Sequence, residues 1–244
     1  MKRFWKAAAA VNVEDGWRIQ LDSRPMRLPT GESLLLRHEK LAHAVAFEWQ
    51  NAGGGEVGGD VKIESLPLTG LAATAEIRIR PDRGQTRDAI ARYGETDLLC
   101  YRAISPQNLV QRQSDLWQPW VEWAREAFSA PLEVTSGIIH IKQKPQSLAA
   151  LSAPLMRYDD YQLTMLSVIV PIFGSLVLGL AVAQGALLAQ EALSLSLLDE
   201  IFAAEQWGED PQILARHAGL GRDVIDAARF ARICAGDAGT VTAG

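Results

Sequence analysis

The chain has 244 residues, of which 48% are hydrophobic and 22% are charged. These proportions are close to the average for globular proteins and exclude a disordered or fibrous chain. The length is sufficient for one large domain or two small ones. The formal net charge of −5 argues against nucleic acid as a partner, because nonspecific affinity for nucleic acid comes from Lys and Arg that neutralise phosphates.

Cysteine usage and the start of the chain indicate the compartment. Cys100 and Cys234 stand in apolar surroundings without CxxC spacing, so neither a disulfide scaffold nor a structural zinc site is expected. The first residues are basic and alanine-rich, but Glu14 and Asp15 follow too soon for a secretory signal or a long transit peptide. We therefore expect a cytoplasmic protein.

The first part of the chain predicts a β meander. Apolar and polar residues alternate from Trp17 to Leu21, which is typical of a half-buried strand. Asp15-Gly16 suits a tight hairpin turn before this strand, and residues 22–25 supply the next break. We expect the meander to continue to about Leu36.

One helix and a glycine-rich loop complete the predicted N-terminal domain. Apolar residues follow helical spacing over 39–49. Residues 53–60 contain five glycines, but neither a following Lys-Ser/Thr nor GxGxxG spacing indicates a nucleotide site. We interpret this segment as a linker and place a β-rich N-terminal domain at residues 1–65.

Residues 66–244 predict a mainly α-helical domain with a short β segment near 132–142, so the expected fold class is α+β. The apolar spacing gives the helices. We expect helices over residues 66–75, 86–103, 105–129, 161–171, 171–185 and 189–207, and one after residue 211. In the third of these, Ser105 is the predicted N-cap and Pro106 the first helical residue.

The uncharged run over residues 161–190 has two interpretations. Its length would allow a membrane span. Against this stand Pro171, three glycines, and acidic flanks without a Lys/Arg cluster. Two buried helices, broken near Pro171 and with Gly185 as an αL cap, are the preferred interpretation, so stable membrane insertion is not expected.

The carboxylates near the end of the predicted helix 189–207 are the most prominent candidates for chemistry. They surround Trp207 and are Asp199, Glu200, Glu205, Glu209 and Asp210. Acids near a helix C-terminus oppose the helix dipole and cost a few tenths of a kcal/mol each. Three interpretations stay open: a solvated face, a docking patch with an aromatic anchor, and a carboxylate-based, possibly metal-dependent hydrolase that uses Glu200 and Glu205.

Catalytic motifs that would favour the hydrolase do not occur. The four histidines are scattered without HExxH spacing, and no GxSxG elbow is present. Glu200 and Glu205 would lie about 140° apart around a helix, so they do not form one compact pair. Because a triad can assemble from distant parts of a sequence, the absence of a motif weakens the enzyme hypothesis without excluding it.

Seven stretches together resemble one known family. They are KRFWK, LDSRPMRLP, LPLTGLAATA, YGETDLLCYRA, LVQRQSDLWQPWVEWA, GSLVLGLAVAQG and LDEIFAAEQWGED. In this order they resemble the assembly chaperones that attend the alpha subunit of the F-type ATP synthase in mitochondria and some bacteria. The chain departs from the family pattern at Ser23, Gly70 and Leu193, where relatives generally have Gly, Arg and Trp. These departures concern local turn shape and local contacts.

The resemblance implies a chaperone without cofactor or turnover that holds the unassembled alpha subunit and prevents its aggregation until the beta subunit takes its place. It implies a key acid at Asp199 or Glu200, and we add Glu205, Trp207 and Glu209 as further partner-binding candidates. We expect a monomer in the bacterial cytoplasm, with eukaryotic relatives in the mitochondrial matrix.

Overall fold

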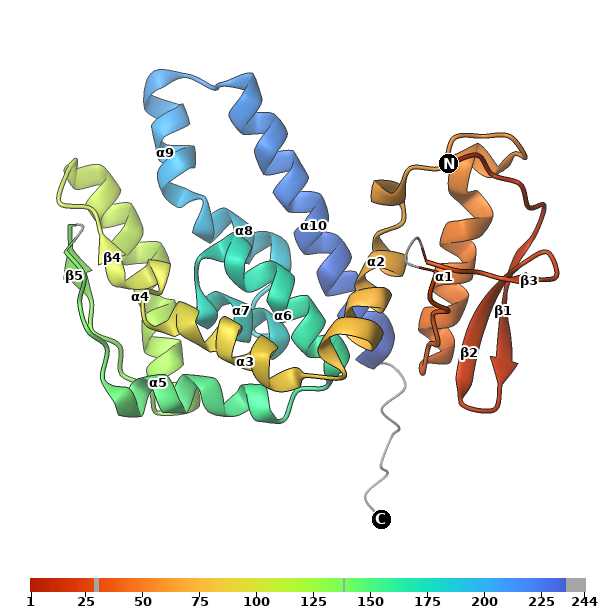
Figure 1. Ribbon diagram of the computed structural model, residues 1–244. Helices are drawn as coiled ribbons and strands as arrows, with labels where there is room; N and C mark the ends of the chain where they lie inside the picture. Colours follow the sequence, from red (N-terminus) through yellow and green to blue (C-terminus); the bar gives the residue numbers. More distant parts are fainter. Residues whose placement is uncertain (29–30, 138, 236–244) are drawn as a thin grey trace, which may run out of the picture. The chain divides into compact units, whose positions relative to one another are not determined.

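The computed structural model describes residues 1–28, 31–137 and 139–235, and the chain divides into two compact units (Figure 1). Unit 1 comprises Met1–Asp82 together with the chain from Arg229 onward, and unit 2 comprises Arg83–Ala228. Most residues are helical, and the small sheet of three strands lies near the N-terminus. The predicted α+β class is confirmed. The predicted boundary after residue 65 concerns which part of the chain folds by itself, and it stays a prediction.

Unit 1 contains an antiparallel sheet in the order β1-β2-β3. Its strands are β1 (Ala8–Val13), β2 (Gly16–Leu21) and β3 (Arg24–Pro25). Val13 pairs with Gly16, so Glu14 and Asp15 form the two-residue turn of the hairpin, one residue earlier than the predicted Asp15-Gly16. The meander is shorter than expected: beyond β3, Leu36 returns to Trp17 only as an isolated bridge.

Helix α1 (Glu39–Asn51) packs against β1 and β2. Its buried residues are Leu41, Ala42, Val45, Ala46 and Trp49, which recur at the spacing that puts one face of a helix against a core. The KRFWK stretch completes this core. The buried Arg3 guanidinium donates to the carbonyls of Trp5 (3.0 Å) and Ala52 (3.0 Å), so its charge is fully hydrogen-bonded inside the fold.

The chain after α1 continues through the predicted loop into α2 (Pro67–Ala73). Glu48 of α1 fixes the start of α2, because its two carboxylate oxygens accept from the backbone N–H groups of Leu68 (2.8 Å) and Thr69 (2.9 Å). These N–H groups have no partner within the helix. The short α2 is thus capped by a side chain from a different helix.

Unit 2 is a bundle in which α6 and α7 form the most buried pair. Its helices are α3 (Arg83–Ala91), α4 (Gln107–Phe128), α5 (Pro145–Ser152), α6 (Asp160–Phe173), α7 (Leu176–Ala183), α8 (Ala189–Ser196), α9 (Leu198–Trp207) and α10 (Pro211–Ala235). The last residues of α10 belong to unit 1. Each end of α6 is well defined: Asp159 caps the start, accepting from Tyr161 N at 2.9 Å, and Gly174 ends it in the left-handed conformation.

The predicted helix 86–103 is wrong in its second half. α3 ends at Ala91, and the TDLLCYR stretch forms a single 3-10 turn followed by β4 (Tyr101–Arg102). The cause is the buried side chain of Asp97. One of its oxygens accepts from Leu99 N (3.1 Å) and the other from Val177 N at the start of α7 (3.0 Å). These hydrogen bonds hold the TDLLCYR stretch in a non-helical conformation, so α3 does not continue through it.

Three other predictions need local correction. The β segment near 132–142 reduces, in its described residues, to β5 (Thr135–Ser136), which pairs in parallel with β4; residue 138 lies outside the described residues. Pro106 is the N-cap of α4 and not its first helical residue. Pro171 lies inside α6, and the break follows at Gly174, whose φ of 60° glycine adopts without strain.

The membrane interpretation of residues 161–190 is wrong. The run forms the short helices α6 and α7 and the start of α8. None of the helices within the described ranges is long and apolar enough to cross a bilayer. The apolar residues instead fill the centre of unit 2, where Leu166, Val177 and Leu180 are fully buried.

Candidate functional site

The acidic segment, residues 198–210, forms the short helix α9 and the turn after it, and not the end of one long helix. The expected helix 189–207 is broken at Leu197 into α8 and α9. The indole of Trp117 on α4 donates to the carbonyl of Leu195 (2.9 Å) near this break. Asp199 and Glu200 therefore lie in the first turn of α9, where the helix dipole stabilises negative charge. The predicted dipole cost was wrong for these two residues.

α9 and the first part of α10 form an antiparallel helical hairpin (Figure 1). Gly208 ends α9 with φ 94°, a conformation that favours glycine. Asp210 then begins the next helix, since its carboxylate accepts from Gln212 N at 2.7 Å. Pro211 occupies the first helical position, where its missing N–H costs nothing.

Glu200 joins the two helices of the hairpin. Its Oε2 accepts from Nη2 of Arg216, and it lies 2.8 Å from Nε2 of His217, both on α10. Partial burial opposes the charge of Glu200, but the hydrogen bonds from Arg216 and His217 outweigh it and lower the pKa of the carboxyl. Glu200 is thus held as a carboxylate inside the hairpin.

Two further acids connect α9 to α4. Arg112 Nη1 donates to Glu205 Oε2 (2.6 Å), and Gln113 Nε2 donates to Asp199 Oδ1 (2.7 Å). The hydrogen bond from Arg112 lowers the pKa of Glu205. These contacts attach α9 to α4 at both ends of α9.

Trp207 is 81% exposed although it is the largest side chain of the segment. It lines an open groove of about 450 Å³ with apolar residues of α10, including Ile213 and Leu214. Glu200, Glu205 and Glu209 line the same groove, whereas Asp199 does not and faces α4. We call this surface the hairpin groove. It combines an apolar floor with an acidic rim.

Glu209 differs from the other candidate acids. Its side chain is exposed, and among the described residues its carboxylate makes no hydrogen bond or ion pair. Glu200, Glu205 and Asp199 each have a partner within the fold. Glu209 is therefore the acid of the segment with its charge fully available to another molecule.

The arrangement gives little support to the hydrolase hypothesis. Glu200 and Glu205 each bind a different arginine, and both have lowered pKa values, whereas a general acid needs a raised one. Within the part of the chain that the structure describes, no group of three or more His, Cys, Asp and Glu is placed to hold a metal ion. The ion pairs of Glu200 and Glu205 instead hold α9 against α10 and α4.

Residues 2–125, more than half of the chain, match the model of the ATP12 chaperone protein. The chain belongs to the ATP12 chaperone family. The predicted resemblance to assembly chaperones of the ATP synthase is thereby confirmed, and so is the chaperone role in ATP synthase assembly.

Solved structures and a curated relative agree with this membership. The chain resembles the crystal structure of Atp12 from Paracoccus denitrificans, with 38% identity and a TM-score of 0.87. The match covers 95% of this chain and 97% of that one. The chain also resembles the Atu1473 protein from Agrobacterium tumefaciens with 34% identity, a TM-score of 0.88, and coverage of 96% and 86%. The mitochondrial atp12 protein of Schizosaccharomyces pombe is 26% identical over 222 residues, covering 85% of this chain and 74% of the relative.

Our sequence interpretation missed the residues that hold the hairpin in place. Arg216 and His217 were not singled out, nor was Arg112. A signal for the first two exists: Gly208 and Pro211 mark a turn between helices, and Glu200 and His217 stand about two helical turns before and after it. Such positions meet across an antiparallel hairpin. Arg112 is 93 residues from Glu205, and no local pattern connects them.

Proposed function

We propose that this ATP12 chaperone holds the unassembled alpha subunit of the F-type ATP synthase by means of the hairpin groove. The observation that carries the assignment of the surface is the exposure of Trp207 beside Ile213 and Leu214. A solvent-exposed indole on an apolar floor is typical of the anchor residues that dominate binding energy. Family membership supports a role in ATP synthase assembly, and the alpha subunit is the client that the sequence resemblance implies.

The candidate residues have different tasks in this proposal. Trp207 and Glu209 contact the client directly, and Glu205 contributes to the acidic rim. Glu200 and Asp199 position the hairpin through their contacts with α10 and α4. An apolar floor with an acidic rim fits a client patch of apolar side chains flanked by Lys or Arg, and the charges accelerate the encounter more than they increase affinity.

The physical consequence is protection of an aggregation-prone surface. A subunit without its neighbours exposes an apolar patch that would otherwise be buried in the assembled complex. A binder that covers the patch lowers the concentration of the free patch. The beta subunit releases the chaperone by competition. We propose that the chaperone acts as a monomer, without turnover, in the bacterial cytoplasm.

Co-purification of the purified alpha subunit with Trp207→Ala tests the role of the groove. We expect a loss of affinity of at least about tenfold, as for the truncation of an interfacial tryptophan anchor. The variant should keep its circular dichroism and melting temperature, because the indole makes few contacts in the free protein.

Ile139→Ala is the matched control, since Ile139 is an exposed apolar residue of the same unit outside the groove. Its affinity should equal that of the unchanged protein. Equal affinities for the unchanged protein and for Trp207→Ala would refute the groove as the binding surface. Absence of binding by the unchanged protein would refute the alpha subunit as client.

A further inference from the structure

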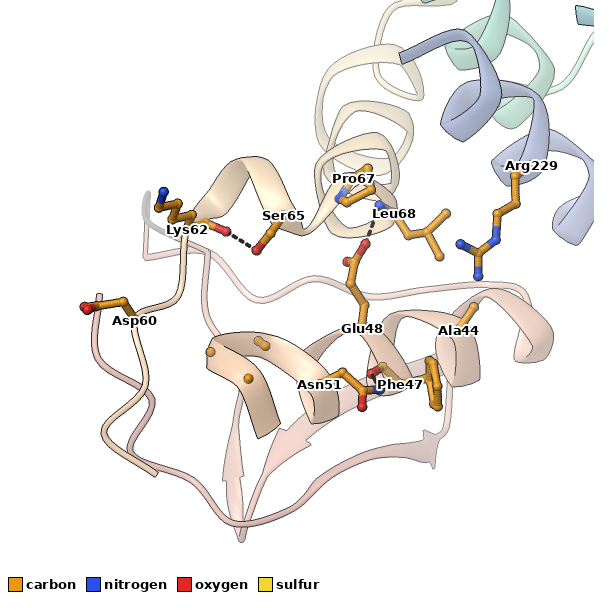
Figure 2. Close-up of a pocket in the computed structure, with 13 residues that line it drawn as sticks. Ala44, Phe47, Glu48, Asn51, Asp60, Lys62, Ser65, Pro67, Leu68 and Arg229 are labelled. Carbon is orange, nitrogen blue, oxygen red and sulfur yellow. Dashed lines mark hydrogen bonds between the residues drawn. The ribbon is translucent and has the colours of Figure 1, made fainter. Parts of the chain in front are cut away.

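Unit 1 has an open pocket of about 480 Å³ between α1 and the segment that leads into α2 (Figure 2). One wall is a face of α1 that carries Ala44, Phe47 and Asn51, and the opposite wall contains Pro67 and Leu68. All lining residues belong to unit 1. We call this hollow the α1–α2 pocket. It is separate from the hairpin groove, which lies wholly in unit 2.

Phe47 is 68% exposed, while the other side of α1 is packed against the sheet. It follows Ala44 by three residues and precedes Asn51 by four, so these three side chains share one helical face. Pro67 and Leu68 add apolar surface across the pocket. The exposed ring is therefore part of an apolar concave surface, and not an isolated apolar residue of the kind that needs no explanation.

The carboxylates that line the pocket are occupied. Glu48 accepts from the backbone N–H of Leu68 (Figure 2) and from that of Thr69. Asp60 forms an ion pair with Lys2 at 2.9 Å, and the hydrogen bond from Lys2 lowers the pKa of Asp60. Neither carboxylate is left without a partner inside the protein.

The cations that line the pocket are available. Lys62 and Arg229 contribute to its wall, and within the described ranges their charged groups make no hydrogen bond or ion pair. The ammonium group of Lys62 lies close enough to Asp60 to contribute to its lowered pKa, but Lys2 holds that carboxylate. The pocket thus offers positive charge beside an apolar ring.

We propose that the α1–α2 pocket is a second docking site for the client, and that it takes a segment in which an apolar side chain stands beside Asp or Glu. The apolar side chain packs on Phe47 and Leu68, and the carboxylate pairs with Lys62 or Arg229. The inference rests on the proposed function, because it names the client as the occupant.

Among the described residues, the charges without a partner differ in sign between the two sites. The hairpin groove has Glu209, whereas the α1–α2 pocket has Lys62 and Arg229 beside carboxylates that are already occupied. A client must offer a basic-apolar patch and an acidic-apolar segment to use both. Two sites of opposite sign reject a partner that satisfies only one of them, and simultaneous use raises affinity without any further contact.

Site-specific photocrosslinking tests the inference. p-Benzoylphenylalanine replaces Phe47 in one variant, Trp207 in a second and Ile139 in a third, and each is irradiated with purified alpha subunit. Mass spectrometry identifies the captured peptide. At position 47 we expect one alpha-subunit segment that contains Asp or Glu beside an apolar residue. Position 139, also exposed, should capture none.

Charge reversal supplies the second readout. Combining the probe at position 47 with Lys62→Glu and Arg229→Glu should reduce the crosslink yield at least about fivefold, as expected from replacing attraction by repulsion at a partly exposed site. Lys142→Glu is the matched control, because Lys142 is an exposed lysine of unit 2. It should leave the yield unchanged.

The outcomes separate the two proposals. Capture at position 207 without capture at position 47 overturns the second site and leaves the hairpin groove intact. A basic or uncharged segment at position 47, or an unchanged yield after the double reversal, overturns it as well. Failure to capture at both positions, together with failure to co-purify, overturns the alpha subunit as client.

Discussion

Glu200 on α9 and His217 on α10 lie 2.8 Å apart, carboxylate oxygen to ring nitrogen, and Arg216 binds the same oxygen. These contacts connect residues that are 17 positions apart in the chain and bring two antiparallel helices together next to the exposed Trp207. The carboxylate of Glu200 is therefore occupied before any client arrives.

Replacing Glu200 by Gln should loosen the hairpin. The substitution removes the charge that Arg216 and His217 bind, and because the side chains are partly exposed the expected loss is about 1 kcal/mol in the free energy of unfolding. Urea denaturation measures it, and hydrogen exchange should show faster exchange in α9. Glu209→Gln is the control and should change neither quantity, since Glu209 has no partner among the described residues. Equal exchange in both variants would contradict the connecting role of Glu200.

Charge reversal at the rim should affect the rate of client binding. Glu209→Lys is expected to slow association at low salt by about threefold, with little change in the dissociation rate. The difference should disappear near 1 M salt, where the Debye length is about 3 Å. Surface plasmon resonance with immobilised alpha subunit measures both rates. A dominant change in the dissociation rate would indicate that Glu209 is buried in the complex and not at its rim.

Glu200→Lys should weaken client binding through the fold. It places a positive group beside Arg216, which repels it, and it removes the carboxylate that His217 contacts. We expect a lower melting temperature of the free protein together with weaker binding, whereas Glu209→Lys should weaken binding at an unchanged melting temperature. If Glu200→Lys weakens binding without any thermal effect, then Glu200 contacts the client directly.

The pH dependence of stability should report on Asp97. Burial raises its pKa from 3.8 to about 6, although four hydrogen bonds oppose the shift. The folded state therefore binds the proton more tightly than the unfolded chain does. The stabilisation by this proton is complete below pH 3.8 and is lost as the pH rises through 6, and it corresponds to about 3 kcal/mol.

Asp97→Asn isolates this contribution, because asparagine does not titrate. The unfolding free energy of the unchanged protein minus that of the variant should fall by about 2 kcal/mol between pH 4 and pH 7, because part of the full effect is already lost at pH 4. Glu200 and Glu205 have lowered pKa values, so they act in the opposite direction below pH 4.5, but they are present in both proteins. Repeating the series at about 1 M salt should preserve the difference, because burial is not screened. A constant difference across the pH range would refute the assignment.

Glu48→Ala should destabilise unit 1. The substitution leaves the backbone N–H groups of Leu68 and Thr69 without their carboxylate partner, which costs about 1–2 kcal/mol, as for the loss of a helix cap. Chemical denaturation measures the change. Glu56→Ala serves as the control, because Glu56 is exposed and its side chain makes none of the described hydrogen bonds, while its backbone carbonyl, which accepts from Gly59 N, stays in place. Similar losses in both variants would contradict the capping role.

The sequence predicted the elements whose cause is local. The first hairpin and the helix from Glu39 follow from turn chemistry and from apolar spacing. Both occur in the structure, although the turn lies at Glu14-Asp15, one residue before the predicted position. The break at Leu197 was missed, because Trp117, which donates to the carbonyl near it, lies 78 residues away from Leu195. Asp97 likewise ends a predicted helix through a partner in α7.

The candidate site was predictable in composition but not in detail. The acids and Trp207 could be named from the sequence, because charged residues around an indole on a helix are conspicuous. Which acids are occupied depends on Arg112 and Arg216, and these belong to other helices. Only the three-dimensional contacts therefore show that Glu200 has a partner and that Glu209 has none among the described residues.

The position of Asp97 also affects the order in which unit 2 can be completed during synthesis. Its second oxygen depends on Val177, 80 residues further along the chain. A nascent chain that has left the ribosome only as far as α6 has this carboxylate but not its partner. The TDLLCYR segment then either keeps its acid in water or buries it without the second hydrogen bond, at a considerable cost. The centre of unit 2 can close only after α7 has emerged.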